Sequence, residues 1–320
     1  MSATTPKQFW PELPLRAWQE TCSTLQLWTQ IIGKIRLVQT PWLNHSWHVP
    51  LYVTAHGLTT SPIPHGGRIF EIQFDFIDHV LQIDTFEGAR RSIALKPQTV
   101  ADFYAAVMRA LAELDLPVAI TDYPCEIAGA IAFSTDRVHS AYDATYAQRF
   151  WHVLLQTDRI MKRFRTGFVG KSSPVHFFWG SFDLAVTRFS GRRAPLFTGK
   201  APRVADAIMR EAYSHEVSSA GFWPGGNGID YPAFYSYAYP TPPGFRDATL
   251  QPTQAFYSDT LGEFLLPYES VRKASDPDAM LLAFFQSTYE AAANSAGWDR
   301  DALECSLGAP GVPRGPIRSP

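Results

Sequence analysis

The sequence is poor in cysteine, which narrows the classes of protein it can belong to. Its 320 residues include three cysteines, Cys22, Cys125 and Cys305, which are widely spaced and odd in number. A disulfide framework needs an even set and a cysteine-based metal site needs close pairs, so the sequence indicates neither. We expect the three to be buried structural thiols.

The sequence also lacks an excess of one charge sign, and it has no long apolar run. The chain has 30 acidic and 28 basic side chains, a net charge of −2, which does not favour nucleic acid or an anionic membrane surface. No stretch approaches the roughly 18 apolar residues of a membrane span, and the N terminus has no basic region followed by an apolar run. The sequence therefore predicts a cytoplasmic protein with no nucleic-acid or membrane partner.

Hydrophobic residues are abundant, and one pattern of residues occurs twice. The 46% hydrophobic content suffices for a large core, and the length is typical of about two domains. Residues 56–67 (HGLTTSPIPHGG) and 215–226 (HEVSSAGFWPGG) share a histidine, an aliphatic residue, two hydroxyl residues and a Gly-Gly pair at constant spacing. This match predicts an internal duplication, with the polar chemistry concentrated in the second copy.

Each copy is predicted to consist of a helix, antiparallel strands and a closing helix. Apolar alternation predicts the strands, and a proline near the first turn marks each closing helix, at Pro97 and Pro277. We therefore predict an α+β protein of two pseudo-symmetric halves packed together. The predicted strands are Trp47–Ala55, Ile69–Phe76, Val175–Phe189 and Ala233–Tyr239. The predicted organisation is a flexible N terminus (1–9), a first α+β repeat (10–140), a second α+β repeat with the candidate site (141–307) and a disordered tail (308–320).

Two local signals add detail to these elements. Thr99 and Asp102 form a capping pair for the first closing helix, although Glu or Gln is commoner at the second position. The second copy also carries an insertion at 190–214, with a short amphipathic helix predicted around 204–213. Insertions of this kind form loops, which often carry function.

Three segments resemble an uncharacterised bacterial family that is catalogued only as a domain of unknown function. They are Trp10–Pro14 (WPELP), Pro174–Leu184 (PVHFFWGSFDL) and His215–Pro224 (HEVSSAGFWP). The resemblance extends from Trp10 to about Glu304. It implies no established activity, cofactor or catalytic residue, so the functional argument depends on the residues themselves.

Side-chain parity singles out one face of the second copy, because successive residues of a strand point to opposite faces. With 175–189 taken as one strand, Trp179, Ser181 and Asp183 share a face. His176 and Arg188 then lie on the opposite face. The face of Asp183 is predicted to line a pocket, provided that no bulge interrupts the strand.

The strand 233–239 carries a stripe of tyrosines on one face, formed by Tyr235, Tyr237 and Tyr239. The corresponding face of the strand 69–76 is charged and is expected to be solvated. Beside Trp179 and Trp223, the stripe predicts a pocket for a small ligand with a flat apolar face and hydroxyl or amine groups. The alternative is that the tyrosines pack beneath a helix or form a homodimer surface.

The residue types needed for acid–base catalysis occur near this face. We predict His215 as a general acid or base that Asp183 or Glu216 orients, and Arg188 as the residue that binds an anionic group. Alternatively, Arg188 lies in a solvated loop or an ion pair. No phosphate-loop, dinucleotide or metal-ligand spacing is present, so we predict neither a cofactor nor a metal.

Three hypotheses of function follow from these patterns. The first is a cytosolic enzyme of hydrolase or transferase type that acts on a small polar or aromatic metabolite in an aromatic-lined pocket of the second repeat. The second is a small-molecule-binding protein without catalysis. The third is a structural or interaction protein that uses the tyrosine face. The residues predicted to form the site are His215, Glu216 and Asp183 for catalysis, and Trp179, Ser181, Arg188, Trp223, Tyr235 and Tyr237 for ligand binding.

Overall fold

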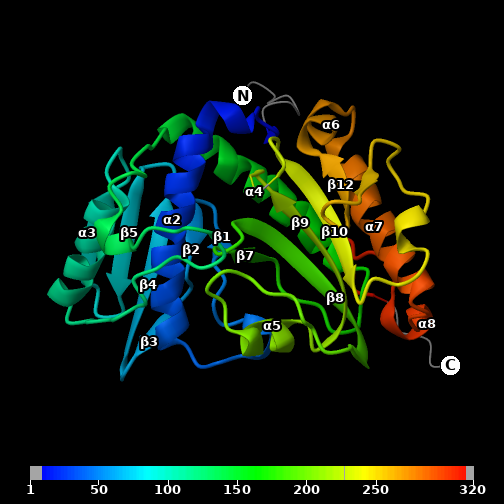
Figure 1. The fold of residues 1–320 in the computed structure, drawn as a ribbon, viewed down its shortest axis with the longest axis horizontal. Coiled ribbons are helices and arrows are strands. Elements are labelled where there is room, and N and C mark those ends of the chain that lie inside the picture. The colour runs from blue at the N-terminus through cyan, green and yellow to red at the C-terminus, as the bar shows by residue number, and fades with distance from the viewer. Residues whose placement is uncertain (1–8, 227, 315–320) are drawn as a thin grey trace.

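The computed structural model describes residues 9–226 and 228–314, which contain two antiparallel sheets of six strands each (Figure 1). The strands of the first sheet are β1 (Tyr52–Val53), β2 (Gly57–Thr59), β3 (Ile63–His65), β4 (Arg68–Asp75), β5 (Val80–Thr85) and β6 (Arg90–Ala94). Those of the second are β7 (His176–Phe178), β8 (Asp183–Arg193), β9 (His215–Trp223), β10 (Ala233–Tyr239), β11 (Phe256–Ser258) and β12 (Glu263–Pro267). The first sheet has the order β1-β2-β4-β5-β6, with β3 also paired to β4, and the second has the order β11-β12-β10-β9-β8-β7.

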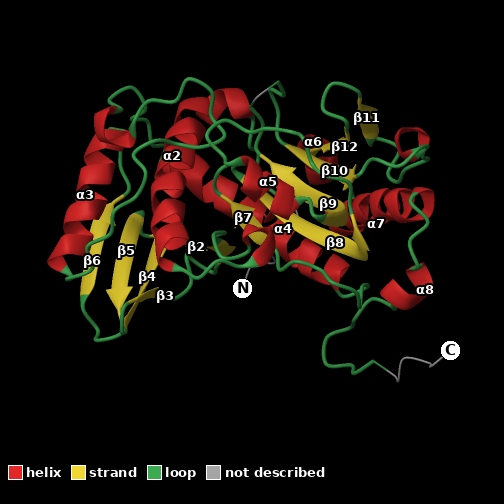
Figure 2. Ribbon diagram, turned by 60° about the horizontal axis from the view of Figure 1, so that its bottom comes forward, coloured by secondary structure: helices red, strands yellow, loops and turns green. Residues whose placement is uncertain are grey.

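Helices precede and follow each sheet, so the predicted α+β class is confirmed. The helices are α2 (Leu15–Gln39), α3 (Val100–Glu113), α4 (Ala144–Arg165), α5 (Asp206–Ala212), α6 (Tyr268–Lys273), α7 (Pro277–Ser295) and α8 (Arg300–Leu303). Short 3₁₀ turns are η1 (Asn44–Ser46), η2 (Phe133–Thr135) and η3 (Phe245–Asp247). Helices α2 and α3 lie along the first sheet, and α4 and α7 along the second (Figure 2). None of the described helices is both long and apolar enough to cross a membrane.

The two sheets are connected through their edge strands. Leu51, which precedes β1, forms an antiparallel bridge with Phe177 of β7. Each backbone N–H donates to the carbonyl of the other residue at 2.9 Å. The halves therefore meet edge to edge, and both residues are fully buried where they meet.

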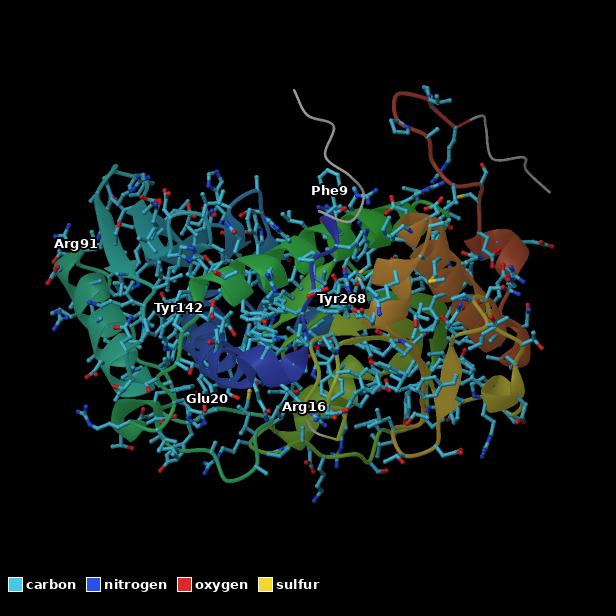
Figure 3. All side chains as sticks on the ribbon, turned by 90° about the horizontal axis from the view of Figure 1, so that it is seen from above. Phe9, Arg16, Glu20, Arg91, Tyr142 and Tyr268 are labelled. Atoms are coloured by element: carbon cyan, nitrogen blue, oxygen red, sulfur yellow. The ribbon has the colours of Figure 1, made fainter. Side chains whose placement is uncertain are left out.

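Helix α2 is the central element between the two halves. Seen from above, α2 and the segment that contains Tyr142 lie in the middle of the molecule, with Arg91 on one side and Tyr268 on the other (Figure 3). Its Trp28 stacks on Phe103 of α3 with ring centroids 4.5 Å apart. A helix that is enclosed in this way buries its polar residues as well as its apolar ones. The buried polar residues of α2 are Thr21, Thr24, Thr29, Gln30, Lys34 and Arg36.

The predicted cap at Thr99 and the start at Pro277 are confirmed, whereas Pro97 lies three residues before the first residue of α3. The Thr99 hydroxyl oxygen accepts from the backbone N–H of Asp102 at 3.1 Å, and its own O–H donates to the Asp102 carboxylate at 2.7 Å. Pro277 is the first residue of α7, and the Asp276 side chain caps this helix. Helix α5 falls inside the segment predicted as a short amphipathic helix.

Two strand predictions are wrong, and turns are the reason in both. Residues 175–189 do not form one strand but the β7–β8 hairpin, with a turn at 179–182 in which Phe182 has a positive φ of 61°. Because the chain reverses there, His176 pairs with Ala185 and lies on the same face as Asp183. Of 47–55 only Tyr52–Val53 is a strand, since residues 47–49 form a turn and a bend directly after the 3₁₀ turn η1.

The two segments that define the predicted duplication differ in local structure. Residues 215–223 form the continuous strand β9, whereas 56–67 contain the short strands β2 and β3 separated by the irregular residues 60–62. The β10 prediction matches the structure residue for residue, and β4 is shifted by one residue. The duplication itself stays a prediction.

The chain ends and the cysteines complete the comparison with the sequence. Residues 1–8 of the predicted flexible N terminus and 315–320 of the predicted tail lie outside the described residues. In the described part of the tail, the Gly308 N–H donates to the Thr166 hydroxyl at the end of α4, at 2.9 Å. Cys22 and Cys125 are buried free thiols, as predicted, while Cys305 is half-buried.

Candidate functional site

The second sheet has one apolar face and one polar face. On the apolar face, Phe222 and Phe234 pack toward α6 and α7. The ring centroids of Phe234 and Phe285 of α7 lie 6.2 Å apart. On the other face, Tyr235 of β10 is opposite Gly221 of β9, which is in turn opposite Ala185 of β8. Residues two positions away along each strand share that face. We call it the polar face; it carries Asp183, Thr187, Ser219, Tyr235, Tyr237 and Glu263.

The turn between β7 and β8 places Asp183 at the start of this face. Phe182 has a left-handed backbone, which costs a non-glycine residue of order 1 kcal/mol or more. The Ser181 hydroxyl donates to one carboxylate oxygen of Asp183, and the Tyr235 hydroxyl donates to the other. Only 7% of Asp183 is exposed, and burial raises its pKa although both hydrogen bonds oppose that shift.

A loop that follows the first half brings a second carboxyl group, Glu126, to this turn. The Gln30 amide of α2 holds the loop, since its Nε2 donates to the Cys125 carbonyl and its Oε1 accepts from the Cys125 N–H, both at 2.9 Å. Glu126 has a positive φ of 61° and its N–H donates to the Pro202 carbonyl at 2.7 Å. Its carboxyl group lies so close to Gly180 that a side chain there would overlap it.

The electrostatics of Glu126 follow from this position. Burial, and then the negative charge of Asp183, raise the pKa of Glu126 to about 7, while Lys34 acts in the opposite direction. A carboxyl group with such a pKa exists in both protonation states at neutral pH, which suits a general acid or base. The strained backbone at both Glu126 and Phe182 is typical of functional sites.

Tyrosines and a third carboxyl group continue the polar face. Tyr235 and Tyr237 are stacked with centroids 6.2 Å apart, and the Tyr237 and Tyr213 hydroxyls lie 3.1 Å apart. Thr187 and Ser219 hydrogen-bond across β8 and β9 at 2.9 Å. Burial, and then Asp183, raise the pKa of Glu263 to about 7. Several polar groups are therefore enclosed here, beside a small apolar cluster that includes Ile229 and Leu265.

Other parts of the second half cover the tyrosines. Phe197 stacks on Tyr213 with centroids 4.2 Å apart, and the Tyr239 hydroxyl donates to the Pro195 carbonyl at 3.0 Å. Both Phe197 and Pro195 belong to the insertion predicted from sequence. Since Tyr235 is only 8% exposed, the stripe is no open surface.

A pocket of about 240 Å³ opens beside this cluster. Its walls include Gln26 of α2, Ser181 and Trp223, and Gln26 donates to the Gly180 carbonyl at 2.9 Å. Asp136 and His139 also line it, with His139 Nδ1 2.7 Å from an Asp136 carboxylate oxygen. A larger groove of about 950 Å³ runs between 16–24 and 138–143. The carboxyl groups of Asp183, Glu126 and Glu263 line neither space, and the smaller pocket meets the cluster through Ser181 and Phe182.

Comparison with protein families agrees with the resemblance seen in the sequence. The model of a family of unknown function, DUF5996, matches residues 10–305. The chain belongs to this family. Neither the curated proteins nor the solved structures gave a match. Membership in DUF5996 brings no activity with it, so function is argued from the site.

In this DUF5996 member, part of the predicted site assembles at the polar face. Asp183, Ser181, Tyr235 and Tyr237 lie together there, and Trp223 joins the pocket wall. Trp179 has another place: its indole N–H donates to the Val49 carbonyl at 2.9 Å and its ring lies against Gly33 of α2. We therefore read Trp179 as an anchor for α2.

His215 and Glu216 lie away from Asp183. His215 is six residues from Gly221 along β9, which corresponds to about 20 Å, and its ring packs against His45 with centroids 6.0 Å apart. Glu216 points to the opposite face and accepts from Ser190 and Arg192, both at 2.8 Å. The structure does not bring the three predicted catalytic residues together.

Arg188 and His176 are both 1% exposed and lie outside the polar cluster. The Arg188 guanidinium stands 3.5 Å from the Phe164 ring centroid and 4.3 Å from that of Tyr289, on the helix side of the sheet. His176 lies among Trp47, Tyr52 and Phe178. Burial, with nearby arginines, lowers the pKa of His176 to about 3.

The predicted site lacks several members of the cluster, among them Lys34, Glu126, Tyr213 and Glu263. Lys34 interrupts the apolar run 31–35 (IIGKI) of α2, and a charged residue within such a run is the signal that could have found it. Glu126 lies in a long connection whose path no periodicity predicts. Within the described residues, no group of three or more His, Cys, Asp or Glu side chains is arranged to hold a metal ion.

Proposed function

We propose that this protein is a cytoplasmic enzyme that performs acid–base catalysis, of hydrolytic or group-transfer type, on a small polar or aromatic molecule bound at the polar face. The observation that carries the proposal is the convergence of Asp183 and Glu126 at one buried turn. Burial raises the pKa of both carboxyl groups, and Ser181 of the same turn lines a pocket. Pairs of carboxyl groups with shifted pKa values near a pocket are common in acid–base enzymes. Glu126 would transfer the proton, and Asp183 with Ser181 and Tyr235 would orient the substrate.

The pocket size and its lining indicate the substrate class. A volume of about 240 Å³ suits a small metabolite rather than a polymer. Trp223 offers an aromatic wall, and Ser181 offers a hydroxyl that connects the pocket to Asp183. Since the chain itself covers the tyrosines, the arrangement supports a small-molecule site over a surface for a protein partner.

The test is a thermal-shift screen of small polar and aromatic metabolites, followed by turnover assays on the compounds that bind. We expect at least one compound to raise the melting temperature of the wild type by several degrees, as ligands of the native state do. Asp183→Asn should lose that shift and lower turnover by roughly a hundred-fold or more. Glu71→Gln, on the half-exposed face of the first sheet, is the matched control and should behave as wild type.

Two results would count against the proposal. If a compound stabilises the wild type and Asp183→Asn equally, the ligand does not use the polar face. If compounds bind in an Asp183-dependent way but Glu126→Gln and the wild type both leave them unchanged, the protein is a binding protein without catalysis.

A further inference from the structure

Lys34 is a largely buried lysine beside the Trp179 ring. It is 8% exposed, and within the described part of the chain it takes part in no ion pair and no hydrogen bond. Its Nζ stands 5.8 Å from the ring centroid of Trp179, the first residue of the β7–β8 turn. The same turn holds Gly180 against Glu126 and Ser181 against Asp183.

The other lysines show how unusual this environment is. Lys162 and Lys273 pair with Asp158 and Glu269 at 2.6 and 2.9 Å, and Lys171 lies 2.7 Å from His45 Nε2. Lys96 is exposed to solvent. Lysine rarely becomes buried without a partner, because its strongly hydrated ammonium group loses water there.

The neighbours of Lys34 do not replace that lost hydration. Burial lowers the pKa of Lys34, although nearby Cys125 and Glu126 act in the opposite direction. Burial also raises the pKa of Cys125 to about 11, so this thiol is neutral at pH 7. A desolvated lysine amine is more easily deprotonated and then becomes a nucleophile.

The charge of the site narrows the chemistry. Asp183, Glu126 and Glu263 share one enclosed region with a single lysine, so an anionic ligand would meet repulsion. A neutral carbonyl compound meets no such repulsion and can react with the amine. We propose that Lys34 is a nucleophile that forms a Schiff base with an aldehyde or ketone group of the substrate, with Glu126 as the proton-transfer group.

The step balances with groups that are present. The neutral Lys34 amine attacks the carbonyl carbon and a C–N bond forms, while one amine proton passes to the carbonyl oxygen to give a carbinolamine. The Glu126 carboxyl group then donates a proton to the departing hydroxyl, which leaves as water as the C–O bond breaks. The resulting carboxylate takes the remaining proton from the nitrogen, so that Glu126 returns to its protonated state. The net change is amine plus carbonyl compound giving imine plus water, with no oxidant or reductant. This inference rests on the proposed function, for which it names a carbonyl compound as the substrate class.

Reductive trapping tests the inference directly. The full-length protein is incubated at pH 7 with benzaldehyde, a neutral aromatic aldehyde, and sodium cyanoborohydride, and the modified lysines are located by peptide mass spectrometry. We expect Lys34 to be modified roughly ten-fold faster or more than exposed Lys96. Lys171, whose pKa burial also lowers, is the internal control for a shifted amine outside the site and should react more slowly than Lys34.

Variants then show whether Lys34 is modified because it is a reactive nucleophile or only because the reagent can reach it. Glu126→Gln should slow adduct formation at Lys34 by roughly ten-fold while Lys96 reacts at its wild-type rate. In Lys34→Met the fast phase of adduct formation should disappear. If that variant fails to fold, the positions and rates of lysine modification in the wild-type protein still test the inference. Modification of Lys96 and Lys171 with Lys34 unmodified, or equal rates at all three, overturns the inference.

Failure of this inference and of the proposed function would look different. If ligand binding and turnover require Asp183 and Glu126 but Lys34 stays unmodified, the acid–base enzyme remains and the Schiff base is excluded. If Lys34 reacts fast and Glu126→Gln leaves its rate unchanged, the proton-transfer role of Glu126 fails.

Discussion

Each sheet has one face that packs against helices and one that does not, and the second kind of face differs in solvent exposure between the two sheets. In the first sheet, Glu71 and Gln73 of β4 are half-buried, and Ile69 beside them is 49% exposed. In the second sheet, Asp183 and Tyr235 occupy the equivalent kind of position and are buried. The apolar side of the sheet is similar in both halves, with Phe70 in β4 and Phe234 in β10 both buried under helices.

The difference teaches that a polar sheet face becomes a candidate site only when the chain encloses it. On the first sheet, water solvates the polar groups, so their presence has little cost. On the second sheet, solvent is excluded by the Glu126 loop and by the insertion at 190–214, which includes α5. Enclosed carboxyl groups without compensation are costly, and proteins retain such arrangements mainly for function.

The largest effect should come from adding a side chain to the enclosed face. At Gly221 a Cβ would overlap the Tyr235 ring, which lies directly above it. Gly221→Ala must displace this buried ring, so we expect a loss of about 3 kcal/mol in the free energy of unfolding, measured by urea denaturation. On the first sheet, Gln73→Ala should change it by less than about 0.5 kcal/mol. Similar values for the two variants would show that the faces do not differ in packing.

The next effect concerns pH and separates the carboxyl groups of the two faces. Because the folded pKa of Glu126 is raised to about 7, its contribution to stability is fully present below pH 4.5 and is lost as pH rises through 7. Glu126→Gln removes this loss, so at pH 8 the variant should be more stable than wild type by on the order of 2 kcal/mol. At pH 4.5 the two should be nearly equal.

Urea unfolding at pH 4.5, 6, 7 and 8 measures this difference. Glu71→Gln, the matched change on the half-exposed face, should track the wild type at every pH. A Glu126→Gln variant that is less stable at pH 8 would mean that the carboxylate is compensated and that the enclosed face is not strained.

At the junction between the sheets we expect a smaller pH effect, in which stability is lost as pH falls and not as pH rises. His176 lies in the edge strand β7, and its folded pKa is lowered to about 3. Its contribution is present above pH 6.5 and is lost as pH falls toward 3. His176→Leu should therefore reduce the stability lost between pH 6.5 and pH 4.5 by about 1 to 2 kcal/mol. Unchanged acid sensitivity in this variant would show that the ring is hydrated or hydrogen-bonded at low pH.

Local chemistry made several elements predictable from the sequence. Alternation in 233–239 predicted β10 and the separation of tyrosines from Phe234, because a strand has a fixed period of two. Thr99 with Asp102 and the proline at 277 predicted helix starts, because caps act within one turn. Ser181 does meet Asp183, but through the turn between β7 and β8 and not through a shared strand face.

Only the tertiary structure decided what meets Asp183. The turn at Gly180 and Phe182 reversed the chain where alternation alone predicted a continuous strand, and so changed the face assigned to His176. Strand parity gives the face but not the distance along it, so it could not separate His215 from Asp183. The sequence by itself determined the faces of β4 and β10 and the helix caps, since these depend on neighbours along the chain. The enclosure of Lys34 and Glu126 depends on contacts between distant segments, which local periodicity does not encode.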